Sequence, residues 1–482
     1  MSQPAIAKTD RSELSGAHSP SLKKKSAPHV LGTIVFITLL GLLVLTAIPY
    51  GTAEAWWKAF FVCVIFSLTI IWLSEGFLSE SWVMDGWPLV FPIVALAVLS
   101  FLQTLSYGHS GQHSGGISFP LWNAISADPY QTRFFALQLL SLILAGALLL
   151  RYASTEGRLR TLINVVIGVA VASAIFGILR QTTQHKIGFG LPLLPLNGGY
   201  GQFINKNHFA FLMEMGFGLT LGMILGGGSK REQALIYFAA LLPIWTALVL
   251  SGSRGALVAM LAQVITAVLL LSTVLRIRHT TGSLSKIMRI SQSLPMRLVL
   301  LLVLICGVAL GTLWLGGDQL ATKIEASRIE FSSDKSESRE GVSRNEIWRM
   351  TLRMFAAHPI LGVGMGAYWA AVPVFHDASG TMTPQEAHND YLELLASGGV
   401  VGAAIGIWFA VVVLRRTRQN LHSRNRFRQA ACFGATVGII GVAVHSLVDF
   451  GLHMIVNAFV FTTLVMIATS KAQWADPTVK RL

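Results

Sequence analysis

The chain has 482 residues, of which 53% are hydrophobic and only 12% are charged, and its net charge is +14. Soluble domains carry about 25% charged residues, so this composition excludes an ordinary soluble protein. Apolar runs long enough to cross a bilayer recur along the whole chain. The three cysteines, Cys63, Cys306 and Cys432, all lie inside such runs, which excludes a disulfide or metal framework. We therefore expect an all-α, polytopic integral membrane protein.

The apolar runs predict about twelve transmembrane helices in chain order. They lie at about 31–49, 56–73, 87–106, 132–150, 161–180, 208–226, 234–250, 255–275, 298–316, 391–414, 429–447 and 451–469. Residues 1–29 precede them as a polar tail that we expect to be disordered and cytoplasmic. The membrane domain, residues 30–470, contains one long loop at 317–390 with short helices, and residues 471–482 form a second cytoplasmic tail.

The basic residues predict the orientation of the chain in the membrane. Most of the 37 Lys and Arg fall on the side of the predicted spans that holds the N-terminus, and the segment 415–428 is the clearest case. The positive-inside rule then makes both termini cytoplasmic and the loop 317–390 periplasmic. The positive charge therefore mostly encodes orientation, and we expect no nucleic-acid partner, although a nucleic-acid or anionic-lipid role for 415–428 stays open as the weaker alternative.

Two basic residues stand at the outer ends of predicted spans. Arg254 lies between two apolar runs, where it either snorkels to lipid headgroups or binds a phosphate in bidentate fashion. Ionisable residues at membrane depth are costly and usually functional, which favours the phosphate. Lys206 is a second phosphate contact or a headgroup anchor, and Asn207 is a candidate helix cap.

The segment 341–359 is the best predicted helix in the long loop. Ser343 and Glu346 have the spacing of a capping box, and Pro359 ends the helix. Asn345, Arg349 and Arg353 fall on one stripe, with the apolar residues opposite. The helix either lies on membrane lipids with solvated arginines or turns its arginines to a lipid phosphate while its apolar side rests on the bilayer. The glycines that follow, at 362–366, indicate a plain turn rather than a phosphate-binding loop.

Two groups of titratable residues follow this helix. His388 can accept a proton near neutral pH, and Asn389 and Asp390 either orient its ring or cap the next helix. His445 and Asp449 are four residues apart, so we expect them to share a helical face, either as an Asp that orients a His or as a satisfied buried pair. Neither group has the spacing of a zinc site.

The sidedness of these residues suggests a reaction. Because there is no ATP outside the cytoplasmic membrane, a donor there must carry its own leaving group, and a membrane-bound pyrophosphate lipid that bears a sugar meets this need. Arginines would bind the pyrophosphate and stabilise its charge, while a histidine would take the proton from an acceptor hydroxyl. In this hypothesis basic residues replace a metal, so we expect neither a metal nor another cofactor.

Five segments, in this order, resemble the bacterial O-antigen ligase and polymerase superfamily. They are GQFINKNHFA (201–210), SGSRGAL (251–257), RNEIWRMTLRMFAAHPILGVGMGAY (344–368), AHNDYLELLASGGVVG (387–402) and HSLVDFGLHMIVNAFVF (445–461). The resemblance implies a glycosyltransferase that moves a glycan from undecaprenyl pyrophosphate to an acceptor at the periplasmic face of the inner membrane, without metal or nucleotide.

The resemblance also implies roles for single residues. The family's arginine near the start of a span matches Arg254, and its loop histidine, followed by glycine some ten residues on, matches His388. The candidates for its loop arginine are Arg344, Arg349 and Arg353, of which Arg344 is favoured by its Arg-x-Glu-Ile-Trp pattern.

The acceptor stays open between lipid A core, a growing polysaccharide and a protein hydroxyl, which correspond to a ligase, a polymerase and a protein O-oligosaccharyltransferase. Two further hypotheses are a transporter or flippase for a lipid-linked or anionic solute, and a catalytically inactive assembly partner.

Overall fold

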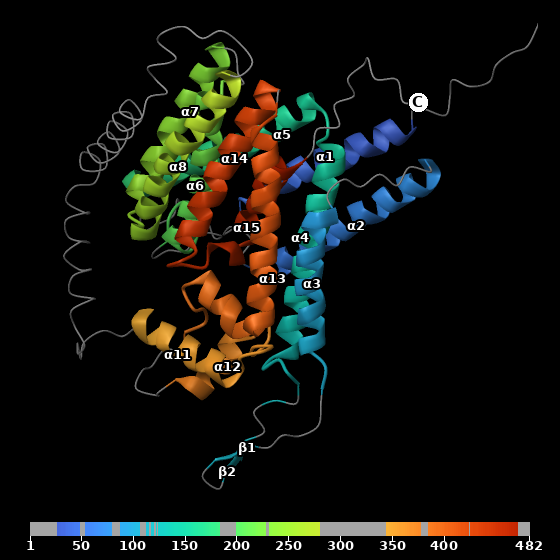
Figure 1. Ribbon diagram of the computed structural model, residues 1–482, viewed down its shortest axis with the longest axis vertical. Coiled ribbons are helices and arrows are strands. Elements are labelled where there is room, and N and C mark those ends of the chain that lie inside the picture. The colour runs from blue at the N-terminus through green and yellow to red at the C-terminus, as the bar shows by residue number, and fades with distance from the viewer. Residues whose placement is uncertain are drawn as a thin grey trace, which may run out of the picture.

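The computed structural model describes residues 27–48, 54–79, 87–106, 112–114, 117–119, 122, 124–183, 199–227, 231–279, 344–376, 384–423 and 425–470. These residues form an all-helical bundle, as predicted, apart from one short antiparallel hairpin (Figure 1). The hairpin pairs β1 (Gln112–Ser114) with β2 (Ile117–Phe119). Outside the described residues lie nearly all of the predicted N-terminal tail, the predicted C-terminal tail, the predicted span 298–316 and the first part of the long loop, 317–343.

Eight of the described helices are long and apolar enough to cross a membrane. They are α2 (Ala55–Ser79), α4 (Pro129–Tyr152), α5 (Glu156–Thr183), α6 (Lys206–Leu225), α7 (Arg231–Leu250), α8 (Arg254–His279), α13 (Asp390–Leu421) and α14 (Arg426–His445). Three shorter apolar helices join them: α1 (Ala27–Thr46), α3 (Trp87–Gln103) and α15 (Ile455–Thr469). Each of these helices coincides with a predicted span, whereas the total of twelve stays a prediction.

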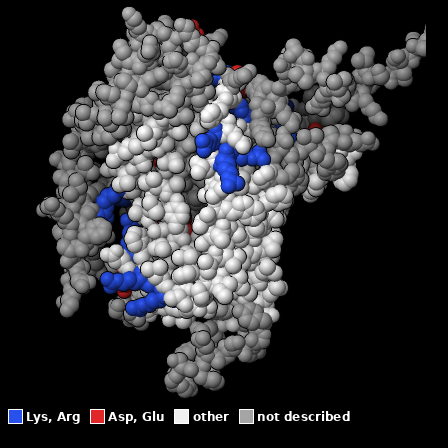
Figure 2. All heavy atoms as spheres, viewed as in Figure 1, with Lys and Arg blue, Asp and Glu red and all other residues white. Residues whose placement is uncertain are grey.

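The surface of the bundle suits a lipid environment. Large apolar side chains such as Phe77, Ile236 and Leu414 are exposed on the described helices. Figure 2 shows a broad face on which charged side chains are sparse, with Lys and Arg gathered in separate patches. An apolar outer surface of this kind is expected where lipid replaces water.

Small residues bring α6 and α14 into close contact at the centre of the bundle. A Cβ atom at Gly218 would overlap the backbone nitrogen of Gly438, and one at Gly222 would overlap the Cα of Gly434. Glycines spaced four apart on both helices therefore let the two backbones touch, as in many membrane helix pairs. The pairing is antiparallel, so the start of α6 lies beside the end of α14, and this arrangement positions the site described below.

A second, smaller unit covers one end of the bundle. It contains α11 (Arg344–Ala357) and α12 (Tyr368–Phe375), which lie at the same end as the hairpin (Figure 1). As predicted, α11 ends before Pro359, and residues 362–366 form a turn.

This unit is attached to α13 at a break in that helix. Gly399 has a φ of 63° inside α13, and the nitrogen of Val400 donates to the carbonyl of Pro359 at 2.8 Å instead of to its own helix. The buried side chain of Gln103 joins both parts, since it donates to the carbonyls of Leu361 (2.5 Å) and Ser397 (2.8 Å).

The apolar side of α11 packs against the protein, contrary to both sequence interpretations, each of which laid this helix on the bilayer. Ile347, Met350 and Met354 are buried, and α11 packs on α12 and α13. The prediction that Asn345, Arg349 and Arg353 fall on one stripe of this helix is confirmed, since all three lie on its exposed side. The predicted cap, Ser343, lies outside the described residues.

Candidate functional site

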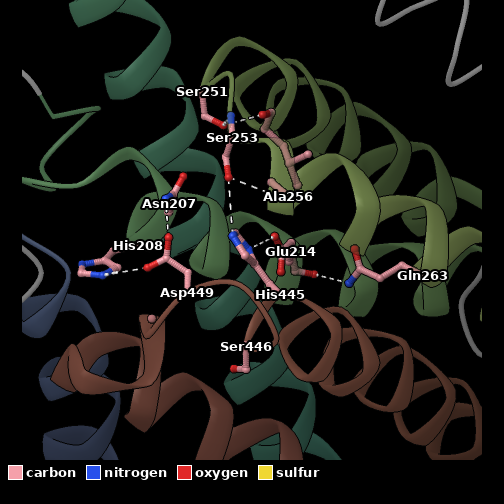
Figure 3. Close-up of polar contacts among 12 residues, drawn as sticks. Asn207, His208, Glu214, Ser251, Ser253, Ala256, Gln263, His445, Ser446 and Asp449 are labelled. Carbon is pink, nitrogen blue, oxygen red and sulfur yellow. Dashed lines mark hydrogen bonds and ion pairs between the residues drawn. The ribbon is translucent and has the colours of Figure 1, made fainter. Parts of the chain in front are cut away.

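Asp449 is the centre of the candidate site. It lies in the turn that follows α14, and only 1% of its side chain is exposed. Its carboxylate accepts a hydrogen bond from the Asn207 side chain, and it lies 3.8 Å from Nε2 of His208 (Figure 3). Nδ1 of His388 lies 3.7 Å away and a guanidinium nitrogen of Arg344 lies 3.5 Å away. One carboxylate thus connects the starts of α6 and α11 with the residue before α13's cap.

The surroundings of Asp449 keep it ionised. Burial alone would raise the pKa of the carboxyl, but the ring of His388, the N–H of Phe450 and the charge of His208 act in the opposite direction and lower the pKa to about 2. Asp449 is therefore a permanent negative charge near neutral pH, and it stabilises positive charge on its neighbours.

His388 occupies a strained position between the loop and the membrane helix. It has a φ of 50°, and among the described residues it is the only non-glycine residue with a positive φ. Its ring packs edge-on against Phe450, with ring centroids 4.8 Å apart, and 32% of the side chain is exposed. Strain of this kind often marks a functional residue. Because Nδ1 faces Asp449, Nε2 is the nitrogen left to meet a substrate.

Three basic residues from three different helices come together next to this pair. Lys206 begins α6 and donates to the carbonyl of Gly252 at 3.4 Å. The charges of Arg254, at the start of α8, and Arg344, at the start of α11, both act on Lys206. Like charges repel, so such a cluster is stable only where something anionic offsets it. Asp449 supplies part of that charge.

The structure separates the three candidate loop arginines. Arg344, which its sequence pattern favoured as the loop arginine, forms an ion pair with Asp449, a partner that the sequence did not predict. Arg349 and Arg353 project from the exposed side of α11, and in the described residues neither forms an ion pair with Asp449. The choice of Arg344 therefore has geometric support that the other two lack.

The predicted pairing of His445 with Asp449 is wrong. Helix α14 ends at His445, so the two residues do not share a helical face. His445 instead turns into the bundle, where its Nδ1 lies 2.6 Å from Oε1 of Glu214, and its Nε2 lies 3.5 Å from Oγ of Ser253 (Figure 3). The histidine that Asp449 faces most directly from the outer unit is His388.

Asn389 and Asp390 were expected either to orient the His388 ring or to cap the next helix, and the structure shows that Asn389 is the cap. Asn389 caps α13 by accepting from the nitrogens of Tyr391 and Leu392 at 3.0 Å each. Asp390 accepts from Oγ of Ser446 at 2.6 Å, which ties the start of α13 to the end of α14. Neither side chain orients the His388 ring, because the carboxylate that faces Nδ1 of His388 is that of Asp449.

The predicted cap of α6 is also wrong. The side chain of Asn205 caps this helix by accepting from the nitrogen of Asn207 at 2.8 Å. The side chain of Asn207 is then free to donate to Asp449. Asn207 therefore belongs to the surroundings of the central carboxylate rather than to the helix end.

A group that could hold a metal lies next to Phe450, whose ring contacts His453. Ligating atoms of Glu386, Glu393 and His453 lie within 4.8 Å of one another. Nδ1 of His453 is 3.3 Å from Glu386 and Nε2 is 3.4 Å from Glu393. Burial alone would lower the pKa of His453, but the carboxylates raise it to about 10, so a proton on His453 already balances part of their charge. The group can hold either this proton or a divalent cation.

Sequence reasoning missed several of these residues. Glu214 is a lone acid inside an apolar run, which is a usable signal. His208 and His453 both lie within the quoted motifs, but no spacing connected them to Asp449 or to Glu386. Phe450, whose ring contacts His208, His388 and His453, gave no signal at all.

Residues 238–407 match a protein-family model described as O-antigen ligase. The matched region runs from α7 into α13 and includes Arg254, Arg344 and His388, whereas Lys206 and Asp449 lie outside it. A search of curated proteins found no match.

Proposed function

Since the chain belongs to the O-antigen ligase and polymerase superfamily, we propose that it transfers a glycan from a polyprenyl pyrophosphate, such as undecaprenyl pyrophosphate, to an acceptor hydroxyl at the periplasmic face of the inner membrane. Membership of the family implies a membrane enzyme of surface polysaccharide assembly. We propose in addition the identity of the lipid-linked donor, the transfer reaction and the periplasmic location of the site.

The observation that carries the proposal is the meeting of Lys206, Arg254 and Arg344 beside the pair formed by His388 and Asp449. A pyrophosphate diester is anionic, and its charge grows as the bond to the sugar breaks. Basic groups that are fixed before the reaction stabilise this charge most effectively. A histidine beside them, held by a buried carboxylate, is suited to accept a proton.

The proposed reaction is a single displacement at the anomeric carbon of the donor sugar. Nε2 of His388 takes the proton of the acceptor hydroxyl, and the acceptor oxygen forms the new glycosidic bond. The bond between the anomeric carbon and the phosphate oxygen breaks, and its electron pair leaves with polyprenyl pyrophosphate. Asp449 stabilises the imidazolium, and the three basic residues stabilise the leaving group. The half-exposed Arg344 can contact both Asp449 and the donor, since 36% of its side chain is exposed.

The proposed topology places the α11–α12 unit in the periplasm and both termini in the cytoplasm. Lys206, Arg254 and His388 all begin or precede helices at one end of the bundle, the end that carries α11 (Figure 1). This end faces the periplasm if the basic segment 415–428 is cytoplasmic. About twelve spans would bring both termini to the same side.

The test uses the purified protein in nanodiscs with a polyprenyl-pyrophosphate glycan and a panel of acceptors: lipid A core, polysaccharide and a serine-containing peptide. Release of free polyprenyl pyrophosphate should require an acceptor and should be lost in His388→Ala and in Arg254→Ala. His422→Ala is the matched control, because His422 is an exposed histidine at the far end of α13. Acceptor-independent release, or equal loss in the control, would contradict the proposal. The productive acceptor would separate ligase, polymerase and protein-glycosylating activities.

A further inference from the structure

Three polar side chains are buried inside the bundle behind the candidate site. Glu214 is 0% exposed, and His445 and Ser253 are each 1% exposed. They come from α6, from the end of α14 and from the residue before α8 (Figure 3). Ionisable groups at membrane depth cost free energy and are seldom kept without a role. The proposed reaction does not use them, because no substrate can reach them.

The ring of His445 is fixed from two directions. Its Nδ1 lies 2.6 Å from Oε1 of Glu214, and Phe211 stacks on its face with centroids 4.2 Å apart and an angle of 18° between the rings. A hydrogen on Nδ1 that points to the carboxylate leaves Nε2 as the free acceptor in the neutral ring. Glu214 therefore determines both the orientation of the ring and the nitrogen that it presents to α8.

His445 contacts the residues on both sides of Arg254. Its Nε2 lies 3.5 Å from Oγ of Ser253, which in turn accepts from the nitrogen of Ala256 at 3.3 Å and so caps the first turn of α8. On the other side, a Cβ atom at Gly255 would lie 2.6 Å from Nε2 of His445. The backbone of α8 thus rests directly on the imidazole, and Arg254 is the residue between the two contacts.

The start of α8 needs such support because it carries one of three neighbouring positive charges. Arg254 and Arg344 both act on Lys206, so repulsion tends to separate the helix ends that carry them. Lys206 also contacts this turn, since its Nζ donates to the carbonyl of Gly252 at 3.4 Å.

We propose that His445 and Glu214 are positioning residues that fix the first turn of α8 and thereby hold Arg254 in place for the donor pyrophosphate. The part of this inference that concerns the pyrophosphate rests on the proposed function, whereas the fixing of the turn does not.

The first experiment measures the turn itself. In hydrogen exchange followed by mass spectrometry, His445→Leu and Glu214→Leu should raise the exchange rate at 251–257 by about tenfold or more, because the cap of α8 loses its support. Thr220→Val is the matched control, since Thr220 is a buried polar residue on the same helix as Glu214 whose hydroxyl donates to the carbonyl of Gly216 in that helix. Equal exchange at 251–257 in wild type and in both leucine variants would overturn the proposal.

The second experiment asks whether His445 acts through Arg254. His445→Leu should lower kcat/KM for the lipid-linked donor by about 10- to 100-fold. The double variant with Arg254→Ala should be no slower than Arg254→Ala alone, since a misplaced arginine and an absent one lose the same interaction. His445→Gln, whose amide oxygen can accept from Ser253, should recover part of the loss. If the double variant instead loses kcat/KM by the product of the two single losses, His445 acts independently of Arg254, and the proposal that it positions Arg254 is wrong.

The two experiments separate the failure of this inference from the failure of the proposed function. If the turn at 251–257 loosens in the leucine variants but the wild type releases no polyprenyl pyrophosphate, the structural role is supported and the proposed donor is refuted. An active wild type with unchanged exchange would do the reverse.

Discussion

Asp449 and His388 face each other at 3.7 Å across the junction between the outer unit and the membrane bundle. The carboxylate comes from the turn between α14 and α15, and the histidine precedes the cap of α13. The pair therefore depends on how the start of α13 packs beside the end of α14. This relationship makes Asp449 the residue through which the fold controls the candidate base.

Replacing Asp449 by Asn should lower the rate of glycan transfer by about 10²- to 10⁴-fold, because the amide no longer stabilises a protonated His388. The measurement is kcat/KM for acceptor-dependent release of polyprenyl pyrophosphate. Asn457→Ala provides a comparison, since Asn457 is buried and its side chain donates to the carbonyls of His208 and Gly451 rather than to Asp449. An Asp449→Asn enzyme of normal activity would exclude Asp449 from the reaction.

The pKa of Asp449 predicts how stability depends on acid. The folded-state pKa of about 2 lies below the ordinary value of 3.8, so the folded protein binds the proton less readily than the unfolded chain. The contribution of Asp449 is therefore complete above pH 3.8 and is lost as pH falls toward 2. Thermal unfolding in detergent should show a smaller loss of stability between pH 5 and about 3 in Asp449→Asn than in wild type. Parallel curves would contradict this assignment.

The three arginines of α11 should differ in importance. Arg344→Ala should reduce transfer by about 10²- to 10³-fold, as expected for the loss of a fixed charge-stabilising group. Arg349→Ala and Arg353→Ala, on the exposed side of the same helix, serve as matched controls and should stay within about threefold of wild type. The same kinetic assay on all three variants decides the matter, and a larger effect at Arg349 or Arg353 would move the donor to the outer surface of α11.

Gln103→Leu should loosen the outer unit. The substitution removes the donor shared by the carbonyls of Leu361 and Ser397 and the acceptor for the nitrogen of Met365. Each buried group left without a partner costs about 1–3 kcal/mol. Limited proteolysis should then cut the segment 359–366 faster than in wild type, with Ser67→Ala, which breaks a bond within α2 alone, as the control. Unchanged cleavage would mean that the break in α13 is sufficient to hold the unit.

Chelation of metals should leave transfer unchanged if the basic cluster alone balances the charge of the donor. The test compares turnover before and after treatment with EDTA. Loss of activity that a divalent cation restores in wild type, but not in Glu393→Gln, would instead assign a functional ion to Glu386, Glu393 and His453.

The sequence predicted the helices well because each span is a long apolar run, and length and hydropathy suffice to locate it. It also singled out Arg254, Arg344 and His388 as candidate site residues, because each stands out against apolar surroundings or within a motif, and their roles stay predictions. It failed on the partners of these residues. Contacts such as Asp449 with His388 and Glu214 with His445 join different parts of the chain. They depend on the close packing of α6 against α14, and the glycines spaced four apart on each helix do not reveal which helix is the partner.

The spacing of His445 and Asp449 shows the same limit in a single segment. Two residues that are four apart share a face only if the helix continues through both of them, and α14 ends at His445. The chain after that point turns, which sends one residue into the bundle and the other to the candidate site.

The most direct test is a cryo-electron microscopy structure of the protein in nanodiscs with undecaprenyl pyrophosphate. We expect the pyrophosphate to contact Lys206, Arg254 and Arg344, with Nε2 of His388 facing the position that the sugar would occupy. A pyrophosphate bound at the basic segment 415–428, or on the exposed side of α11, would contradict this expectation.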